Sequence, residues 1–276
     1  MSNKVSFALN HMSAPKLPHR AFFHLARQLG MSDVEIRNDL AGVALANGTP
    51  SGDVRAAAAA EGVNIISINA LQRFNHWSDV RAREATELAA YAKGCGAAAL
   101  VLCPVNDTSW QPENAARLEH LRQSLHELAP ILRQHGVRGL VEPLGFIECS
   151  LRLKREALDA IDATDTSDVF QVLHDTFHHV VAGETEMFPA RTGLVHISGV
   201  ADPKVPVSAM RDPHRVLIGK PDFIGNVAQI AALRAGGYAG PFSFEPFAKE
   251  VHDNPDIASA LQASRALIDT ELHIAA

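Results

Sequence analysis

The sequence of 276 residues has few cysteines, no long apolar run and no surplus of basic residues. Its three cysteines form no close pair, which excludes zinc-finger spacing and is typical of a reduced cytoplasmic protein. No stretch reaches the roughly 18 apolar residues of a membrane helix, and the first residues lack the apolar core of a signal peptide. A net charge of −6 without a basic run argues against a nucleic-acid surface. We therefore expect a cytoplasmic protein that binds neither membrane nor nucleic acid.

Strand-like and helix-like segments alternate along the whole chain. The expected strands, rich in Val, Ile, Leu or Phe, are Val5–Asn10, Asp33–Asn38, Asn64–Ala70, Ala99–Pro104, Gly139–Leu144, Phe170–Asp175, Leu194–Gly199 and Phe242–Phe247. The expected helices, most of them followed by a glycine stop, are Lys16–Leu29, Gly52–Glu61, Ser78–Lys93, Pro112–Gln134, Lys154–Thr164, Gly225–Arg234 and Asp256–His273. Repeated βα units predict a parallel sheet. Because no glycine-rich phosphate motif follows the first strand, eight such units favour a closed barrel over an open sheet. We predict an α/β fold in which residues 1–276 form a single (β/α)8 TIM-barrel domain.

Two segments break the alternation of strands and helices. Phe177–Thr192 contains only a short helical piece, and Val200–Asp222 is a long segment with four prolines. Both follow strands that carry polar side chains, and barrel active sites are built from the loops at this end of the strands. Long loops without secondary structure of their own are often functional, so we expect both segments to border the active site.

Four of the apolar strands each contain one residue that could bind a metal: Glu142, Asp175, His196 and Glu245. An unpaired carboxylate in an apolar strand is very unfavourable, so such charges are paired or bind metal. Taken singly, each has a structural alternative: either glutamate could pair with a buried arginine, Asp175 could cap the next helix, and His196 could be a hydrogen-bonded core residue. Together they lie on strands five to eight, which are neighbours in a closed barrel. Their donor atoms predict one divalent ion, with Mn²⁺ the best match and Co²⁺, Mg²⁺ or Zn²⁺ as alternatives.

Other polar residues are expected around the mouth of the barrel. His178 follows Asp175 by three residues and would point over the mouth, while His174 faces the other side of its strand and His179 is expected on the surface. Residues expected to contact the hydroxyl groups of a substrate are Asn10, Arg37, Asn69, Arg73 and His76, with Phe74, Trp77 and Phe177 as apolar walls. Arg37 could equally be a structural ion-pair partner.

These residues resemble a known family, the xylose isomerase-like TIM barrels, over nearly the whole chain. The matching stretches are Ala8–Asn10, Val34–Arg37, Ile68–Leu71 with Phe74-Asn75, Val141–Pro143, Asp175–His178, Val195–Ile197 and Phe244–Phe247. The segment Ile68–Leu71 with Phe74-Asn75 is most similar to the inosose isomerase branch. The resemblance implies that the four predicted ligands bind the metal and that Glu142 and Glu245 are the catalytic acid/base pair. It also implies that His178 and Arg215 bind the substrate.

The expected activity is therefore that of a metal-dependent isomerase. Such an enzyme moves a carbonyl between adjacent carbons of a keto-cyclitol of the 2-keto-myo-inositol type, or of a free keto-sugar, through an enediolate. A ketose 3-epimerase or a hydroxypyruvate isomerase could use the same four ligands. A non-catalytic sugar-binding barrel is the alternative from another class. The expected partner is a small polyhydroxy ketone, and a homo-oligomer is possible. A phosphorylated substrate is disfavoured because the loop after the last strand has no glycine.

Overall fold

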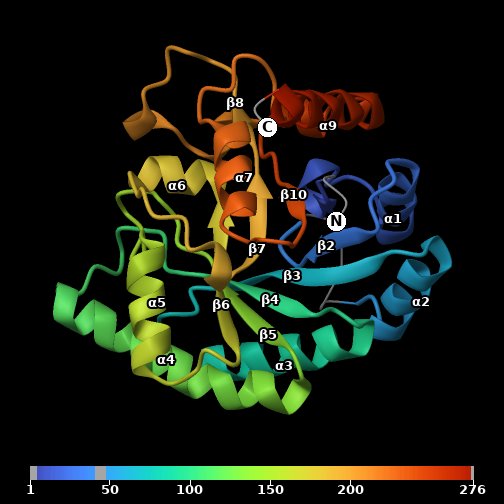
Figure 1. Ribbon diagram of the computed structural model, residues 1–276. Helices are drawn as coiled ribbons and strands as arrows, with labels where there is room; N and C mark the ends of the chain where they lie inside the picture. Colours follow the sequence, from blue (N-terminus) through green and yellow to red (C-terminus); the bar gives the residue numbers. More distant parts are fainter. Residues whose placement is uncertain (1–4, 41–47, 275–276) are drawn as a thin grey trace.

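The computed structural model describes residues 5–40 and 48–274. Eight parallel strands close into a barrel with the predicted topology (Figure 1). In spatial order they are β1 (Phe7–Asn10), β2 (Asp33–Arg37), β3 (Asn64–Gln72), β4 (Ala99–Cys103), β5 (Arg138–Val141), β6 (Phe170–Asp175), β7 (Thr192–Ile197) and β10 (Phe242–Phe244), which pairs with β1 again. The prediction of a (β/α)8 barrel is confirmed.

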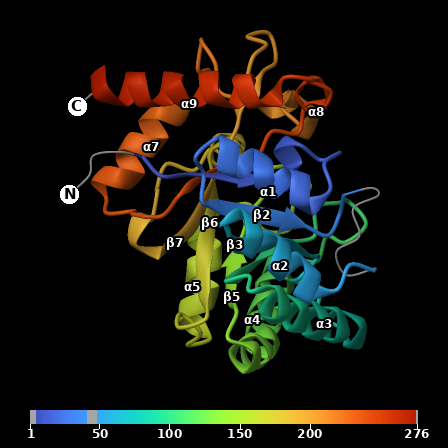
Figure 2. The same ribbon diagram turned by 90° about the vertical axis from the view of Figure 1, so that its right-hand side faces the viewer.

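Helices surround the strands and provide the outer layer of the core. They are α1 (His19–Gln28), α2 (Ser51–Glu61), α3 (Asp79–Cys95), α4 (Asn114–His135), α5 (Lys154–Ala163), α6 (Thr176–Ala182), α7 (Asn226–Ala235), α8 (Lys249–His252) and α9 (Ile257–Ile274). The C-terminal helix α9 contacts α7 and runs along one side of the molecule (Figure 2). Within the described residues, none of the helices is both long and apolar enough to cross a membrane.

The strands β5 and β10 each end three residues before the predicted end. In both places the strand is followed by Glu and then Pro, and a proline has no N–H to donate to a neighbouring strand. The glutamates Glu142 and Glu245 still donate their own N–H groups, to Leu102 and Ile197 respectively. Each glutamate is therefore the first residue beyond its strand, at the rim of the barrel.

The long segment after β7 was expected to have no secondary structure, and this expectation is wrong. It forms a small antiparallel pair, β8 (Gly199–Val200) with β9 (Arg215–Val216), and two short 3₁₀ turns. A Cβ atom at Gly199 would lie 2.9 Å from the carbonyl oxygen of Leu217, so this close pairing requires glycine. The pairing holds Arg215 beside the barrel mouth.

The interior of the barrel has an apolar part and a polar part. Leu140, Leu173 and Leu194 lie two residues before Glu142, Asp175 and His196, and alternation along a strand directs each pair to the same side. Buried polar side chains fill the part enclosed by β1, β2, β3 and β10: Asn10, Glu35, Ser67 and Ser243. The candidate ligands therefore lie above leucines on one side and beside a buried polar network on the other.

His11, directly after β1, is fully buried and stacks on Phe22 with ring centroids 4.2 Å apart. Burial lowers the pKa of His11 to about 4, even though its Nε2 lies 2.8 Å from the carbonyl oxygen of Leu17. The folded protein therefore keeps His11 neutral at pH values where the unfolded chain binds a proton.

We predict that the free energy of unfolding falls as the pH drops from about 6.5 toward 4. One pKa unit corresponds to about 1.4 kcal/mol, so His11 alone would contribute a loss of up to roughly 3 kcal/mol. Urea unfolding at pH 7 and at pH 4.5 measures this loss in the wild type and in His11→Gln. Glutamine cannot titrate, so the variant should lose less stability over the same interval. Equal losses in both proteins would contradict the assignment.

Candidate metal centre

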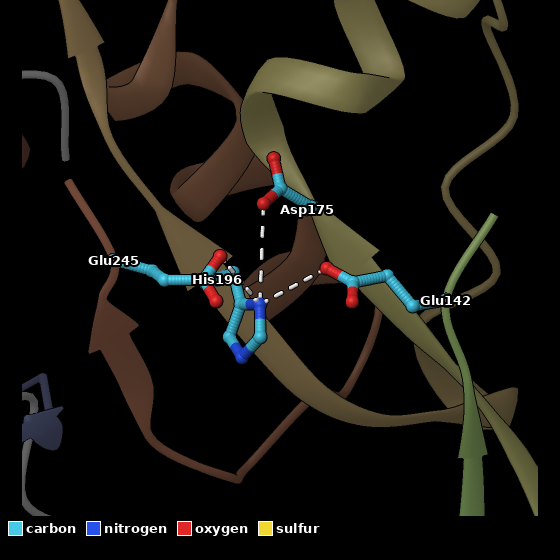
Figure 3. A group of neighbouring side chains, drawn as sticks. All are labelled: Glu142, Asp175, His196 and Glu245. Carbon is cyan, nitrogen blue, oxygen red and sulfur yellow. Dashed lines mark hydrogen bonds and ion pairs between the residues drawn. The ribbon is translucent and has the colours of Figure 1, made fainter. Parts of the chain in front are cut away.

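The four predicted ligands meet at the carboxyl ends of β5, β6, β7 and β10. Donor atoms of Glu142, Asp175, His196 and Glu245 all lie within 4.8 Å of one another, and all four residues are buried. Nδ1 of His196 is 3.1 Å from an oxygen of Glu142, 3.1 Å from one of Glu245 and 3.9 Å from one of Asp175. Figure 3 shows the carboxylates of Glu142 and Glu245 on opposite sides of the imidazole, with Asp175 between them.

Neighbouring charges set the direction in which the pKa values of His196 and Glu245 are shifted. Burial alone lowers the pKa of His196, but the carboxylates of Glu245, Glu35 and Glu142 outweigh it and raise that pKa well above its usual value. Burial alone raises the pKa of Glu245, but His196 and the guanidinium of Arg215 outweigh it and lower that pKa. Three carboxyl side chains thus face one ring nitrogen, which is a donor set that fits a divalent cation.

Two buried arginines approach the same carboxylates. Arg37 donates from Nη1 to Glu245 at 2.6 Å and pairs through Nε and Nη2 with both oxygens of Asp39. Arg215 donates from Nη2 to Asp175 at 2.6 Å and to Glu245 at 2.8 Å, and its Nη1 is 3.3 Å from Asp212. Each arginine is therefore paired with two or more carboxylates of the protein, and Nε of Arg215 also donates to the hydroxyl of Ser198.

Asp175 has two roles that the sequence presented as alternatives. Its Oδ1 accepts hydrogen bonds from the backbone N–H groups of Phe177 and His178 and so caps α6. Its Oδ2 faces His196 and Arg215. One carboxylate therefore fixes the start of α6 and also contributes to the candidate metal centre.

The first turn of α6 holds His178 at the cavity wall. The backbone N–H of Gly145 donates to Nδ1 of His178 at 3.2 Å, so in the neutral ring the proton is on Nε2. His174 faces outward and bonds Gln229, as expected. The expectation that His179 is exposed is wrong, because His179 is buried against Lys154, whose Nζ lies 2.9 Å from its Nδ1.

A cavity of about 220 Å³ opens above this group. That volume is below the roughly 300–1,000 Å³ of pockets for drug-sized ligands, so it suits a small molecule. In the described part of the chain it is lined by Arg37, Asp39, Asn69, Gln72, Cys103, Asn106, Glu142, Leu144, Phe146, His178, Asp212, Arg215, Glu245 and Phe247. The lining is mostly polar, as recognition of hydroxyl groups requires.

Four residues predicted to contact the substrate are not among the side chains that line this cavity. One of them, Asn10, is buried and donates to Glu35 and Glu245. The other three follow β3. Arg73 forms an ion pair with Asp107, His76 stacks on Trp110 with centroids 4.9 Å apart, and Trp77 packs against the main apolar core. They follow β3 at the expected end of the barrel, but the chain there turns outward at Arg73, whose φ is +55°. The expected walls Phe74 and Phe177 are both core residues.

A family model of the xylose isomerase-like TIM barrel matches residues 23–267. The chain belongs to this family. A xylose isomerase domain-containing protein of Salmonella typhimurium LT2 is 32% identical over 99% of both chains, with a TM-score of 0.88. A comparison with curated protein sequences gave no match.

Two solved structures of lower identity share the family fold. IolI, solved with a bound zinc atom, is 17% identical over 97% of this chain and 98% of its own, with a TM-score of 0.83. L-Ribulose 3-epimerase is 18% identical over 99% of this chain and 96% of its own, with a TM-score of 0.77.

The sequence analysis did not identify one buried carboxylate in the barrel of this protein. Glu35 on β2 is fully buried and contacts Nε2 of His196 at 3.0 Å. The sequence contains the pattern that could have identified it, because Glu35 is a single acidic residue between Val34 and Ile36. The same pattern identified Glu142. Asp39 and Asp212 were also missed; both lie in loops, where an aspartate carries no comparable signal.

Replacing Gly145 by alanine should destabilise the protein. A Cβ atom there would lie 2.4 Å from the backbone oxygen of His178 and 2.6 Å from the backbone nitrogen of Ala182. Overpacking of this kind typically costs about 1–3 kcal/mol. Urea unfolding at neutral pH measures the loss, with Gly219→Ala as the matched control because nothing lies within 4 Å of a Cβ atom at that position. Equal stability of the two variants would contradict the close contact between this loop and α6.

Proposed function

We propose that the protein is a divalent-metal-dependent isomerase that acts on an uncharged polyhydroxy ketone. The best candidates are a keto-cyclitol of the 2-keto-myo-inositol type and a free keto-sugar. The observation that carries this proposal is the meeting of Glu142, Asp175, His196 and Glu245 beneath a small polar cavity. Membership of the xylose isomerase-like family and the fold shared with an L-ribulose 3-epimerase support it.

The four side chains would hold one divalent ion, with Mn²⁺ the preferred candidate and Co²⁺, Mg²⁺ or Zn²⁺ as alternatives. Such an ion supplies Lewis-acid stabilisation of negative charge on oxygen atoms of the substrate. The rest of the reaction depends on side chains of the protein that position the substrate and move its protons.

The two glutamates are the proposed acid/base pair. Glu245 accepts hydrogen bonds from Arg37, Arg215, Asn10 and Asn69, which hold it in place. Glu142 contacts His196 and the Cys103 thiol, and among the described residues no arginine pairs with it, so we assign removal of the proton next to the carbonyl to Glu142. The proton returns to the former carbonyl carbon, while a proton passes from the neighbouring hydroxyl oxygen to the former carbonyl oxygen, and the carbonyl has then moved by one position.

The placement of the glutamates also favours a second candidate, a ketose 3-epimerase. Because Glu142 and Glu245 lie on opposite sides of His196, a proton removed from one face of a carbon could return to the other face. The product distinguishes the two reactions, since an epimerase inverts one carbon and leaves the carbonyl in place.

Three further side chains are proposed to bind the substrate: His178, Asn69 and Arg215. His178 lines the cavity and would donate its Nε2 proton to a substrate oxygen, because its Nδ1 accepts the N–H of Gly145. Asn69 and Arg215 lie beside Glu245 and also line the cavity. Arg37 is paired with Glu245 and Asp39 much as Arg215 is paired with Asp175 and Glu245. We assign Arg37 to holding these carboxylates, and we assign the substrate contact to Arg215 because the family resemblance implies it there.

The charges of the cavity favour an uncharged substrate. Its basic lining residues are Arg37 and Arg215, and both are already paired with carboxylates of the protein. Lys220, a conceivable phosphate ligand, instead pairs with Glu271 at 2.6 Å. A ketose phosphate or hydroxypyruvate would therefore meet carboxylates without a free cationic side chain among the described lining residues.

We predict that Glu142→Gln and Glu245→Gln each slow the exchange of solvent deuterium into the substrate by about 10²–10⁴-fold, because each removes one acid/base group. The measurement is NMR in deuterated water with a panel of inososes and free ketoses. Wild-type enzyme treated with a chelator should show no exchange, and adding Mn²⁺ should restore it.

Metal content and melting temperature must be measured for both glutamine variants. Glu245→Gln leaves Arg37 and Arg215 without one of their partners, so it should also lower stability more than Glu142→Gln does. Exchange at the wild-type rate in both metal-loaded variants would refute the acid/base assignment. No exchange with any member of the panel would refute the isomerase and epimerase proposals for those substrates.

We predict that hydroxypyruvate and ketose phosphates give at least about tenfold lower kcat/KM than a neutral ketose, because repulsion by carboxylates in a partly dry cavity exceeds about 1.4 kcal/mol. Asp212→Asn should narrow this difference, since it removes a carboxylate beside Arg215. The control is Asp168→Asn, which breaks a surface pair with Arg133 outside the cavity. Equal kcat/KM for neutral and anionic substrates in the wild type would contradict the prediction.

A further inference from the structure

Glu35 is a buried carboxylate that the proposed reaction does not use. It lies on β2 with no exposed surface. Its oxygens accept hydrogen bonds from the hydroxyl groups of Ser67, at 2.6 Å, and Ser243, and from the side-chain amide of Asn10 at 3.2 Å. In the described part of the chain, the titratable side chain in contact with Glu35 is His196, whose Nε2 is 3.0 Å from one oxygen and 3.1 Å from the other.

The barrel register brings these residues together from neighbouring strands. Asn10 and Ser67 are the neighbours of Glu35 on the adjacent strands β1 and β3. Ser243 on β10 is the neighbour of His196 on β7. Three uncharged donors from three strands therefore hold the Glu35 carboxylate against the imidazole, and its position is set by the barrel itself.

The two nitrogens of His196 consequently face different surroundings. A carboxylate can only accept a hydrogen bond, so the contact with Glu35 requires a proton on Nε2. Nδ1 faces the carboxylates of Glu142, Asp175 and Glu245, and a cation held by them would take the place of a proton on Nδ1. The ring that remains is the neutral tautomer with its proton on Nε2, directed at Glu35. Metal-binding histidines commonly donate their second N–H to a carboxylate in this way, which fixes both the tautomer and the orientation of the ring.

We propose that Glu35 is a positioning residue that keeps the proton of His196 on Nε2 and thereby presents the Nδ1 lone pair to a divalent cation. This inference rests on the metal-dependent function proposed above. Glu35 does not line the cavity formed by the described residues, so its effect on substrate would act through His196.

The first test is metal affinity in the full-length chain. Titration calorimetry of the metal-free protein with Mn²⁺ or Zn²⁺ should show a dissociation constant about 10–100-fold higher in Glu35→Gln than in the wild type. Glutamine keeps the size of the side chain, but its amide can either donate to or accept from Nε2, so it no longer selects one tautomer. A wild-type dissociation constant in Glu35→Gln would overturn the proposal.

Two control variants separate this role from a general effect on packing. Glu184→Gln makes the same chemical change at a largely buried carboxylate whose contacts are with Lys154, Arg155 and His179 and not with the four candidate ligands, and it should bind metal as the wild type does. Ser243→Ala removes one hydrogen bond to Glu35 but keeps the Glu35–His196 contact, and should weaken binding only a few-fold. Equal weakening in Glu184→Gln and Glu35→Gln would show a packing effect and overturn the proposal.

The second test uses the wild-type protein, so its result does not require that any variant folds correctly. In protein labelled with ¹⁵N-histidine and loaded with ¹¹³Cd²⁺, the coupling to cadmium should appear on Nδ1 of His196, and Nε2 should carry the proton. Coupling to Nε2 would overturn the proposal. The expected coupling together with no deuterium exchange for any ketose would support the role of Glu35 and refute the isomerase function instead.

Discussion

The balance of buried charge around His196 is the constraint on which the rest of the site depends. Glu35, Glu142 and Glu245 contact its ring, and Asp175 lies 3.9 Å from its Nδ1. So many carboxylates cannot be buried together unless positive charge or hydrogen-bond donors compensate them. The protein meets this requirement with Arg37 and Arg215, with the N-terminus of α6 and with the side-chain donors of the polar interior. A divalent cation at Nδ1 would complete the compensation.

The groups that compensate the buried charge are distributed unequally between the two candidate catalytic residues, Glu142 and Glu245. Glu245 is surrounded by two guanidinium groups and two side-chain amides, whereas Glu142 has an imidazole and a thiol as neighbours. The two glutamates follow their strands in the same Glu-Pro sequence, yet they enter different electrostatic surroundings. A site with one restrained and one less restrained carboxylate is well suited to a reaction in which a proton leaves and returns. The same arginines, because they are already paired, also disfavour an anionic substrate.

The barrel interior supports the site from below. Leucines of β5, β6 and β7 form an apolar floor beneath Glu142, Asp175 and His196. Serines and Asn10 on the opposite strands satisfy Glu35, which contacts the ring nitrogen that faces away from the candidate metal. The small hairpin of β8 and β9 adds Arg215 from outside the barrel. The ligands, their supporting carboxylate Glu35 and Arg215 thus come from separate parts of one fold.

The sequence alone was sufficient for the barrel and for the four candidate ligands. Short runs rich in Val, Ile, Leu or Phe and helices followed by glycine depend on local chemistry, and an acidic residue in an apolar run is visible in any sequence. The same pattern could have identified Glu35, between Val34 and Ile36. Only the tertiary structure decided which side chains meet: it directs Arg73, His76 and Trp77 away from the cavity and pairs Arg37 with Glu245. It also brings Asp39, Asp212 and Arg215 to the mouth. These outcomes depend on the course of loops and on contacts between residues far apart in the chain, and no local pattern encodes the distance between two such residues.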